Sequence, residues 1–165
     1  MARIGRRSLV VVLALGGLLG YELVPRDDRR ILGVLNDLCA KLNQTRDEAS
    51  LAELQAALRV SLVDGVSVRS PELGQDLSGL AAVTERARDL LAVPPLSFAL
   101  VDSELHVSGD LARVTANLLV SERGSGEQHR DLRLTEVRLR KSGPAWRVEA
   151  VSVDPVRPAE PEARP

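Results

Sequence analysis

The sequence predicts an α+β domain in which three helices pack on the concave face of a curved, bulged antiparallel sheet, with a membrane helix at the N-terminus. Three observations predict this architecture. Residues 1–25 are basic and then apolar, most of residues 26–93 space their apolar side chains as helices do, and residues 96–154 alternate apolar and polar side chains. A run of helices followed by a run of strands is typical of the α+β class.

The composition is that of one ordinary globular domain between two terminal segments. Of the 165 residues, 44% are hydrophobic and 27% are charged, and residues 155–165 form a proline-rich tail that we expect to be disordered. Residues 26–154 remain as the domain. The single cysteine excludes a disulfide scaffold and a cysteine-based zinc site, and two histidines leave little room for a metal centre. We therefore expect neither a metal nor another cofactor.

Nucleic acid is an unsuitable partner for this chain. The formal net charge is −1, the pI is about 6.2, and the aromatic residues are Tyr21, Phe98 and Trp146. Nucleic-acid binders are basic, and those that hold single strands stack the bases on aromatic side chains. The composition therefore predicts no nucleic-acid binding.

The leader, residues 1–25, has the pattern of an export signal. Three arginines precede an unbroken apolar run from Leu9 to Gly20, which is shorter than the ~20 residues of a full membrane span. Cleavage after Gly20 would place Leu18 where a small residue is needed, so we favour an uncleaved single-pass signal anchor, with cleavage and secretion as the alternative. The short N-terminal stub favours an orientation that puts the domain outside the cytoplasm.

The first predicted helix begins at Asp27 and Asp28, because carboxylates are favoured at helix N-termini. Its apolar side chains recur every three or four residues, and Asn43 is a suitable end. Cys39 borders this apolar stripe, and we expect it to be a small packed hydrophobe. The stripe consists of Ile31, Val34, Leu35, Leu38 and Leu42.

The second predicted helix starts with a capping box. Thr45 and Glu48 have the required spacing, with the hydroxyl and the carboxylate each accepting a backbone hydrogen bond. Its buried side is expected to carry Leu51, Leu54 and Leu58.

A short strand pair and a third helix complete the first half. Residues 62–68 alternate with period two around Asp64-Gly65, which predicts a turn at those two residues. The third helix follows Gly79 and ends before Pro94, because proline cannot continue it. Its apolar residues are Leu80, Val83, Ala87, Leu90 and Leu91.

From Leu96 onward, the pattern predicts four antiparallel strands, with turns at residues 108–110, 124–127 and 142–144. The apolar positions of the third strand change phase after Leu134, which predicts a β-bulge near residues 135–136. A similar phase shift occurs in the last strand at residues 150–151. Bulges bend strands, and a bent sheet has a concave side that helices can fill.

Two local segments add to this order of elements. Leu77-Ser78-Gly79 opens the third helix, and the closing hairpin, residues 137–148, carries Trp146 just after its turn. Together with the element order over roughly residues 28–154, these features resemble the nuclear transport factor two-like superfamily, a cone-shaped fold that includes SnoaL-like proteins and ketosteroid isomerase. The chain is most similar to membrane-tethered bacterial members that have an N-terminal anchor and no assigned activity.

The resemblance implies several catalytic designs, and the sequence completes none of them. Isomerases of the ketosteroid type need a tyrosine beside two acids, but Tyr21, the single tyrosine, lies in the leader. Dehydratases of the superfamily also use tyrosines, with a histidine and an aspartate. Epoxide hydrolases use an Asp-Arg-Asp set, and the spacing of Asp102, Arg113, Asp131 and Arg133 singles out no such triad. We therefore assign no catalytic, cofactor-binding or metal-binding residue.

The histidines and one charge cluster are the remaining candidates. His106 lies between two apolar strand residues and should face solvent, and His129 follows a glycine-rich hairpin and should also lie in water. The cluster could bind phosphate or an anionic lipid surface, although exposed strand faces commonly carry such charges to resist edge pairing. The cluster consists of Arg133, Glu136, Arg138, Arg140 and Lys141.

These observations predict a non-catalytic, membrane-tethered domain outside the cytoplasm that binds a partner protein or a small apolar ligand. A homodimer could form through the open face of the sheet, since an exposed apolar sheet face is unfavourable. The alternative is a small-molecule isomerase or lyase, which needs a carboxylate of raised pKa inside the cone. A filled apolar interior would favour the interaction domain, and an open cavity with converging polar groups would favour ligand binding.

Overall fold

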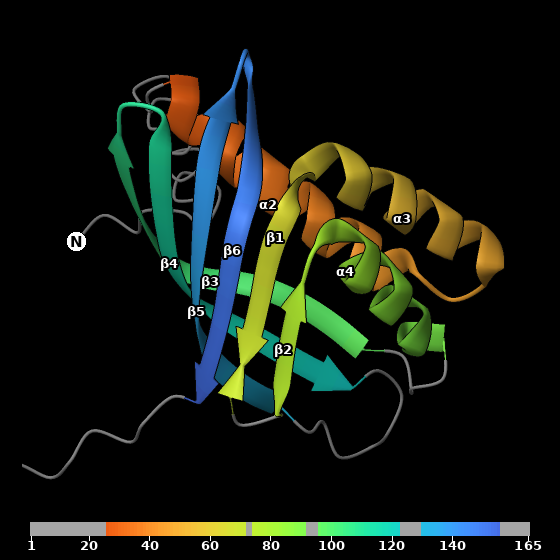
Figure 1. Cartoon of the computed structure of the whole chain (residues 1–165). Helices are drawn as coiled ribbons and strands as arrows, with labels where there is room; N and C mark the ends of the chain where they lie inside the picture. Colours follow the sequence, from red (N-terminus) through yellow and green to blue (C-terminus); the bar gives the residue numbers. More distant parts are fainter. Residues whose placement is uncertain (1–25, 72–73, 92–95, 123–129, 156–165) are drawn as a thin grey trace, which may run out of the picture.

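The computed structural model describes residues 26–71, 74–91, 96–122 and 130–155 (Figure 1). In chain order the elements are α2 (Arg26–Gln44), α3 (Glu48–Ser61), β1 (Leu62–Ser70), β2 (Gln75–Ser78), α4 (Leu80–Arg86), the 3-10 helix η2 (Ala87–Leu91), β3 (Leu96–Ser108), β4 (Leu111–Glu122), β5 (Arg130–Ser142) and β6 (Ala145–Pro155). None of the helices in these ranges is long and apolar enough to span a membrane. The predicted leader lies outside the described residues, as does the predicted tail except for Pro155, which is the last residue of β6.

The sheet is mixed, so the prediction of a purely antiparallel sheet is wrong. Its six strands have the order β2-β1-β6-β5-β4-β3. The pairs from β3 to β6 and the pair β1–β2 are antiparallel, but β1 runs parallel to β6, with Leu62 beside Val148. β1, which directly follows α3, therefore starts at the same end of the sheet as β6. Alternation of side chains specifies which face a residue occupies but not the direction of its neighbour, so the sequence pattern could not show this.

The helices cover the concave side of the curved sheet, as predicted (Figure 1). α2 packs along β3 and α3, and α3 and α4 lie against β1. Leu51, Leu54 and Leu58 are the buried residues of α3, as the spacing predicts. The hydrophobic core consists of Ile31, Leu35, Leu54, Leu58, Leu62, Val66, Ala112, Val114, Ala116, Val137, Leu139, Trp146 and Val148.

The turn predicted at Asp64-Gly65 does not form, because β1 continues through both residues. Val66 is fully buried, which holds this part of the strand against the core. The register between β1 and β6 shifts between Leu62 and Ser67, so Asp64 and Gly65 lie in an irregular stretch of strand. The antiparallel partner of β1 is instead β2, which follows Ser70 in the chain.

The helix cap lies two residues later than predicted. The Asp47 side chain accepts a hydrogen bond from the Ser50 backbone nitrogen at 2.8 Å, and Ser50 Oγ accepts from the Asp47 nitrogen at 3.0 Å. Thr45, the predicted cap, is buried and donates to the carbonyl of Lys41 at 2.8 Å. It therefore closes the end of α2 and is not free to cap α3.

Removing this cap should lower stability in a pH-dependent way. Hydrogen bonds from the backbone and side chain of Ser50 hold the pKa of Asp47 below its ordinary value of 3.8. The carboxylate therefore stabilises the fold fully above that value, and the contribution is lost as the pH falls through the lowered pKa. We expect Asp47→Ala to lower the thermal midpoint at pH 7 and to approach the native chain at about pH 2.

Asp47→Asn is the matched control, since asparagine also caps helices but does not titrate. At pH 7 the thermal midpoint of Asp47→Asn should lie much closer to that of the native chain than the midpoint of Asp47→Ala does. Scanning calorimetry of the three proteins from pH 2 to pH 7 measures both effects. A constant difference between Asp47→Ala and the native chain across this range would contradict the assignment.

The β-bulge predicted near residues 135–136 is absent. β5 pairs with β4 in continuous register from Arg130 to Arg140. The register of β5 with β6 shifts between Arg138 and Leu139, and the extra residue is Glu149 on β6, close to the phase shift predicted for that strand. β3 has a further irregularity at Asp102, whose φ is 51°.

The phase change in β5 has another cause. Val137 and Leu139 face the core, whereas Leu132 and Leu134 lie on the opposite, outer face with 40% and 44% of their surface exposed. The strand carries apolar side chains on both faces, first outside and then inside. A one-residue change of phase was therefore a sign of an exposed apolar patch, not of a bulge.

Candidate functional site

Where the helices cover the concave side of the sheet, the described interior is packed with buried apolar side chains. Ile31 and Leu54 from the helices and Val114 and Leu139 from the sheet have no exposed surface. The buried polar residues of the described ranges are Thr45, Ser70 and Thr135, and none of these ionises near neutral pH. Among the described residues, no group placed to accept or donate a catalytic proton lies in the core.

Cys39 lies at the border of the core, where the sequence places it. Its side chain is half-buried and free of disulfide bonding. Burial raises the pKa of the thiol, which keeps it protonated near neutral pH. This fits the predicted packed hydrophobe.

The start of α2 is joined to the end of β5. Lys141 Nζ donates to Asp27 Oδ2 at 2.9 Å and lies 5.5 Å from the centre of the Trp146 ring, which is buried. The hydrogen bond from Lys141 holds the pKa of Asp27 below its usual range. The start of α2 therefore lies at the end of the sheet that carries the β3–β4 and β5–β6 turns, called here the turn end.

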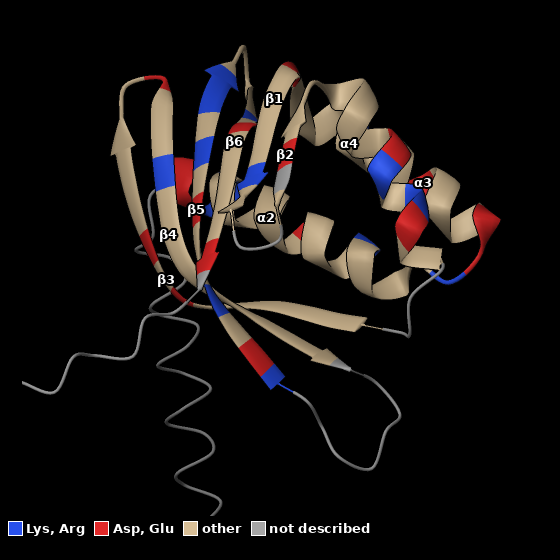
Figure 2. Ribbon diagram, turned by 60° about the horizontal axis from the view of Figure 1, so that its bottom comes forward, with Lys and Arg blue, Asp and Glu red and all other residues tan. Residues whose placement is uncertain are grey.

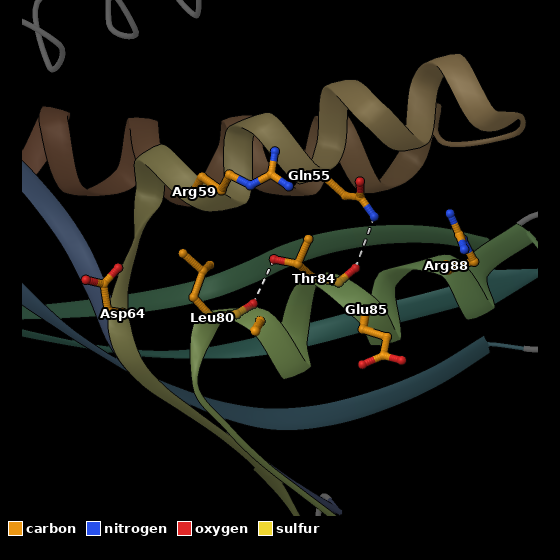
Figure 3. A pocket seen from close by; sticks show the side chains of 8 residues that line it. Gln55, Arg59, Asp64, Leu80, Thr84, Glu85 and Arg88 are labelled. Atoms are coloured by element: carbon orange, nitrogen blue, oxygen red, sulfur yellow. Dashed lines mark hydrogen bonds between the residues drawn. The ribbon is translucent and has the colours of Figure 1, made fainter.

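A first cleft of about 670 Å³ lies between α3 and α4 (Figure 3). Gln55 donates to the carbonyl of Thr84 at 3.2 Å, and the Thr84 hydroxyl donates to the carbonyl of Leu80 at 2.7 Å. These polar groups are used in holding the helices together. The charged side chains around them have both signs in equal number, namely Arg59, Asp64, Glu85 and Arg88. The cleft therefore has no charge preference and no paired acid and base.

A second hollow of about 700 Å³ lies on the outer face of the sheet near the turn end. Its charged and titratable side chains are His106 on β3, Arg113 on β4, Arg138 and Arg140 on β5, and Glu149 on β6. We call it the arginine groove. Figure 2 shows basic stretches of β4 and β5 toward this end of the sheet, and further basic stretches at the opposite end of β5, where Arg130 and Arg133 lie. His106 is exposed here, so its predicted solvent-facing position is confirmed, whereas His129 lies outside the described residues.

The structure divides the predicted charge cluster between two faces. Glu136, Arg138 and Arg140 point outward, whereas Lys141 reaches α2 on the concave side. Arg133 lies on the same side of β5 as Lys141, and its guanidinium contacts Asp131 at 2.6 Å.

The residue types of the epoxide hydrolase set are not brought together. Asp131 and Arg133 form an ion pair with each other, but Arg113 is on the outer face and contacts Glu136 at 3.6 Å. Asp102 lies at the irregular point of β3, where Asn117 approaches it at 3.5 Å. No triad forms among these four residues.

The outer face also carries an apolar patch, which gives residues to the apolar sheet face expected from the sequence. Leu119 of β4 pairs with Leu132 of β5, and Leu134 is the next outward residue of β5. We call these three residues the leucine patch. It lies at the end of the sheet opposite to the turn end. The signal was present as the early phase of β5, which was interpreted as a bulge.

The fold is similar to that of solved proteins described as nuclear transport factor two-like or as having a cystatin-like fold. The sequence matches no protein-family model, and no curated protein is significantly similar to it.

Three solved structures illustrate the likeness. A Mycobacterium tuberculosis protein of unknown function has a TM-score of 0.66 at 15% identity, covering 96% of this chain and 80% of that one. A nuclear transport factor two-like protein from Novosphingobium aromaticivorans has a TM-score of 0.62 at 16% identity, covering 94% and 92%. A Streptomyces avermitilis protein of the same family, whose name proposes a dehydratase, has a TM-score of 0.64 at 19% identity, covering 80% and 97%. At these identities the likeness concerns the fold alone.

Proposed function

We propose that the chain is a non-catalytic, membrane-tethered domain that lies outside the cytoplasm and acts by binding a protein partner through the outer face of its sheet. The observation that carries this proposal is the filled interior. Ligand-binding members of a cone-shaped fold need an open space on the concave side of the sheet. In this chain the core on that side includes Leu54, Leu58, Val114 and Leu139. Binding must then use a surface.

The isomerase or lyase alternative has less support. It needs a carboxylate inside the cone whose pKa is raised by burial. The carboxylates with clearly shifted pKa values in the described ranges are Asp27 and Asp47, and both pKa values are lowered by hydrogen bonds. Both residues lie outside the core.

The partner that fits the leucine patch best is a second copy of the chain. The patch is apolar, and its borders carry both signs of charge, with Arg130 beyond Leu132 and Asp154 beside Leu134 on β6. A two-fold axis through the patch would lay leucine on leucine and could place Arg130 of one copy near Asp154 of the other. A membrane tether would favour this pairing by confining the copies to one surface.

Light scattering during size exclusion tests the pairing. Residues 26–165, which contain the whole described core, should form a dimer at high micromolar concentration and dissociate on dilution. Leu132→Asp should shift the dissociation constant by at least tenfold, because a charge would be buried in an apolar contact. Leu111→Asp is the matched control, since Leu111 is also exposed on the outer face but lies at the turn end.

A monomer at every concentration would refute the dimer. So would equal loss of association in both variants. Circular dichroism of each variant checks that the fold is kept.

A further inference from the structure

Four arginines on the outer face form two like-charge pairs on neighbouring strands. Arg113 of β4 lies opposite Arg138 of β5, and Arg140 of β5 lies opposite Arg147 of β6. Like charges in directly opposite positions destabilise a sheet. The arrangement is therefore unfavourable for the isolated domain and calls for a negative partner.

The neighbouring carboxylates neutralise only part of this charge. Arg140 binds Glu149 at 2.6 Å, and Arg113 contacts Glu136 at 3.6 Å. In the described ranges Arg138 is exposed and has no ion-pair partner. The Nε of Arg147 is buried without a hydrogen-bond partner. The exposed guanidinium group of Arg138, which lines the arginine groove, thus retains donors whose hydrogen bonds an anion could accept.

The position of the arginine groove narrows the choice of anion. Arg140 immediately precedes Lys141, which holds the start of α2 through Asp27, and the Lys141 nitrogen donates to the carbonyl of Asp110 at 2.8 Å. The groove therefore lies at the turn end, where α2 starts. A leader anchored in a bilayer would keep this end close to the headgroups, within the ~8–10 Å over which charges act in physiological salt.

We propose that the arginine groove binds the phosphate headgroups of anionic phospholipids in the membrane that holds the tether. This rests on the proposed function, because it takes the leader to be an anchor. Guanidinium groups bind phosphate oxygens in pairs of parallel hydrogen bonds, which suits a row of arginines. The groove is formed by strands, whose backbone amides are used in the sheet, and it lacks the helix N-terminus that typically cradles a soluble phosphate.

The leucine patch remains available in this arrangement. It lies at the other end of β4 and β5, so headgroup binding at the turn end and pairing of two copies do not compete for the same residues.

The test uses the full chain in lipid nanodiscs. A fluorophore is attached to Ser142→Cys, an exposed position at the end of β5 that is not part of the groove's lining, in a Cys39→Ser background, and quenching by headgroup-labelled lipid reports its distance from the bilayer. Quenching should be several-fold stronger in discs containing phosphatidylglycerol than in phosphatidylcholine alone. About 0.5 M salt should abolish the difference.

Two double variants separate the groove from general charge. Arg113→Gln with Arg138→Gln should lose the difference between the two lipids, since each arginine near an anionic surface strengthens binding roughly fivefold. Arg59→Gln with Arg88→Gln removes the same charge from the cleft between α3 and α4 and should keep the difference. Equal quenching in both lipids, or equal loss in both variants, would overturn the proposal. Release from the headgroups by micromolar pyrophosphate would assign the groove to a soluble phosphate instead.

Failure of the tether gives a different result. A chain that does not enter discs of either composition contradicts the anchor of the proposed function. The same labelled chain is then added to phosphatidylglycerol vesicles, where the groove still predicts salt-sensitive binding that Arg113→Gln with Arg138→Gln loses. Absence of that binding would overturn the groove proposal as well.

Discussion

Leu54→Ala is expected to lower the free energy of unfolding by about 2–5 kcal/mol. Leu54 is a fully buried residue of α3 and belongs to the side chains that fill the concave side of the sheet. Truncation removes apolar contacts and leaves a cavity that the surrounding sheet cannot close. Urea unfolding of residues 26–165, followed by the fluorescence of Trp146, measures the effect.

Leu111→Ala is the control for this substitution. Leu111 is 50% exposed at the start of β4, so the same truncation should change the free energy of unfolding by less than about 1 kcal/mol. Equal effects of the two substitutions would show that Leu54 does not pack in the core. The fold would then lack the filled interior on which the proposed function depends.

Asn43→Ala should be the second most destabilising of the changes considered, by about 1–3 kcal/mol. The Asn43 side chain binds the edge strand β3 at Phe98, where Nδ2 donates to the carbonyl oxygen at 2.9 Å and Oδ1 accepts from the backbone nitrogen at 2.6 Å. Asn43 thus makes the two hydrogen bonds that a residue of a neighbouring strand would make at this edge of the sheet. Alanine would leave both backbone groups of a half-buried position unpaired.

The neighbouring residue provides the comparison. Gln44 is exposed, and Gln44→Ala should be close to neutral. Hydrogen exchange at the Phe98 amide gives a local reading, since Asn43→Ala should accelerate it far more than the global loss of stability requires. Unchanged exchange at Phe98 would contradict the role assigned to Asn43.

The sequence was informative where one physical signal dominates. Burial of one helix face repeats every three to four residues, so Leu51, Leu54 and Leu58 could be placed correctly. The long strands from Leu96 onward were equally clear, because β4, β5 and β6 each bury part of one face and β3 alternates half-buried and exposed side chains over residues 104–108. Their turns at Gly109 and Gly143 could be predicted because both glycines adopt positive φ, which other residues rarely do.

Tertiary contacts decided the features that sequence reasoning missed. Asp64-Gly65 is a strong turn signal, but burial of Val66 beside β6 keeps β1 extended. Thr45 has the residue type of a cap but is buried under the end of α2, so Asp47 takes that role. The parallel pairing of β1 with β6 depends on where α3 delivers the chain, which no local pattern records.

The candidate sites were the hardest features to predict. The charge cluster could be recognised along β5, but alternation divides it between the two faces, and only Arg138 and Arg140 reach the arginine groove. Arg113 joins them from β4 through strand register, and Glu149 joins from β6. Register is a property of paired strands, so a single strand's sequence cannot predict such a cluster.

Ligand titration of residues 26–165, followed by the fluorescence of the single tryptophan, Trp146, tests most directly whether the interior is filled. Benzene should produce no saturable change in the native domain, and it should bind the Leu54→Ala variant, whose cavity is apolar. Saturable binding of benzene or another small apolar ligand by the native domain would contradict a filled interior and a function confined to the surface.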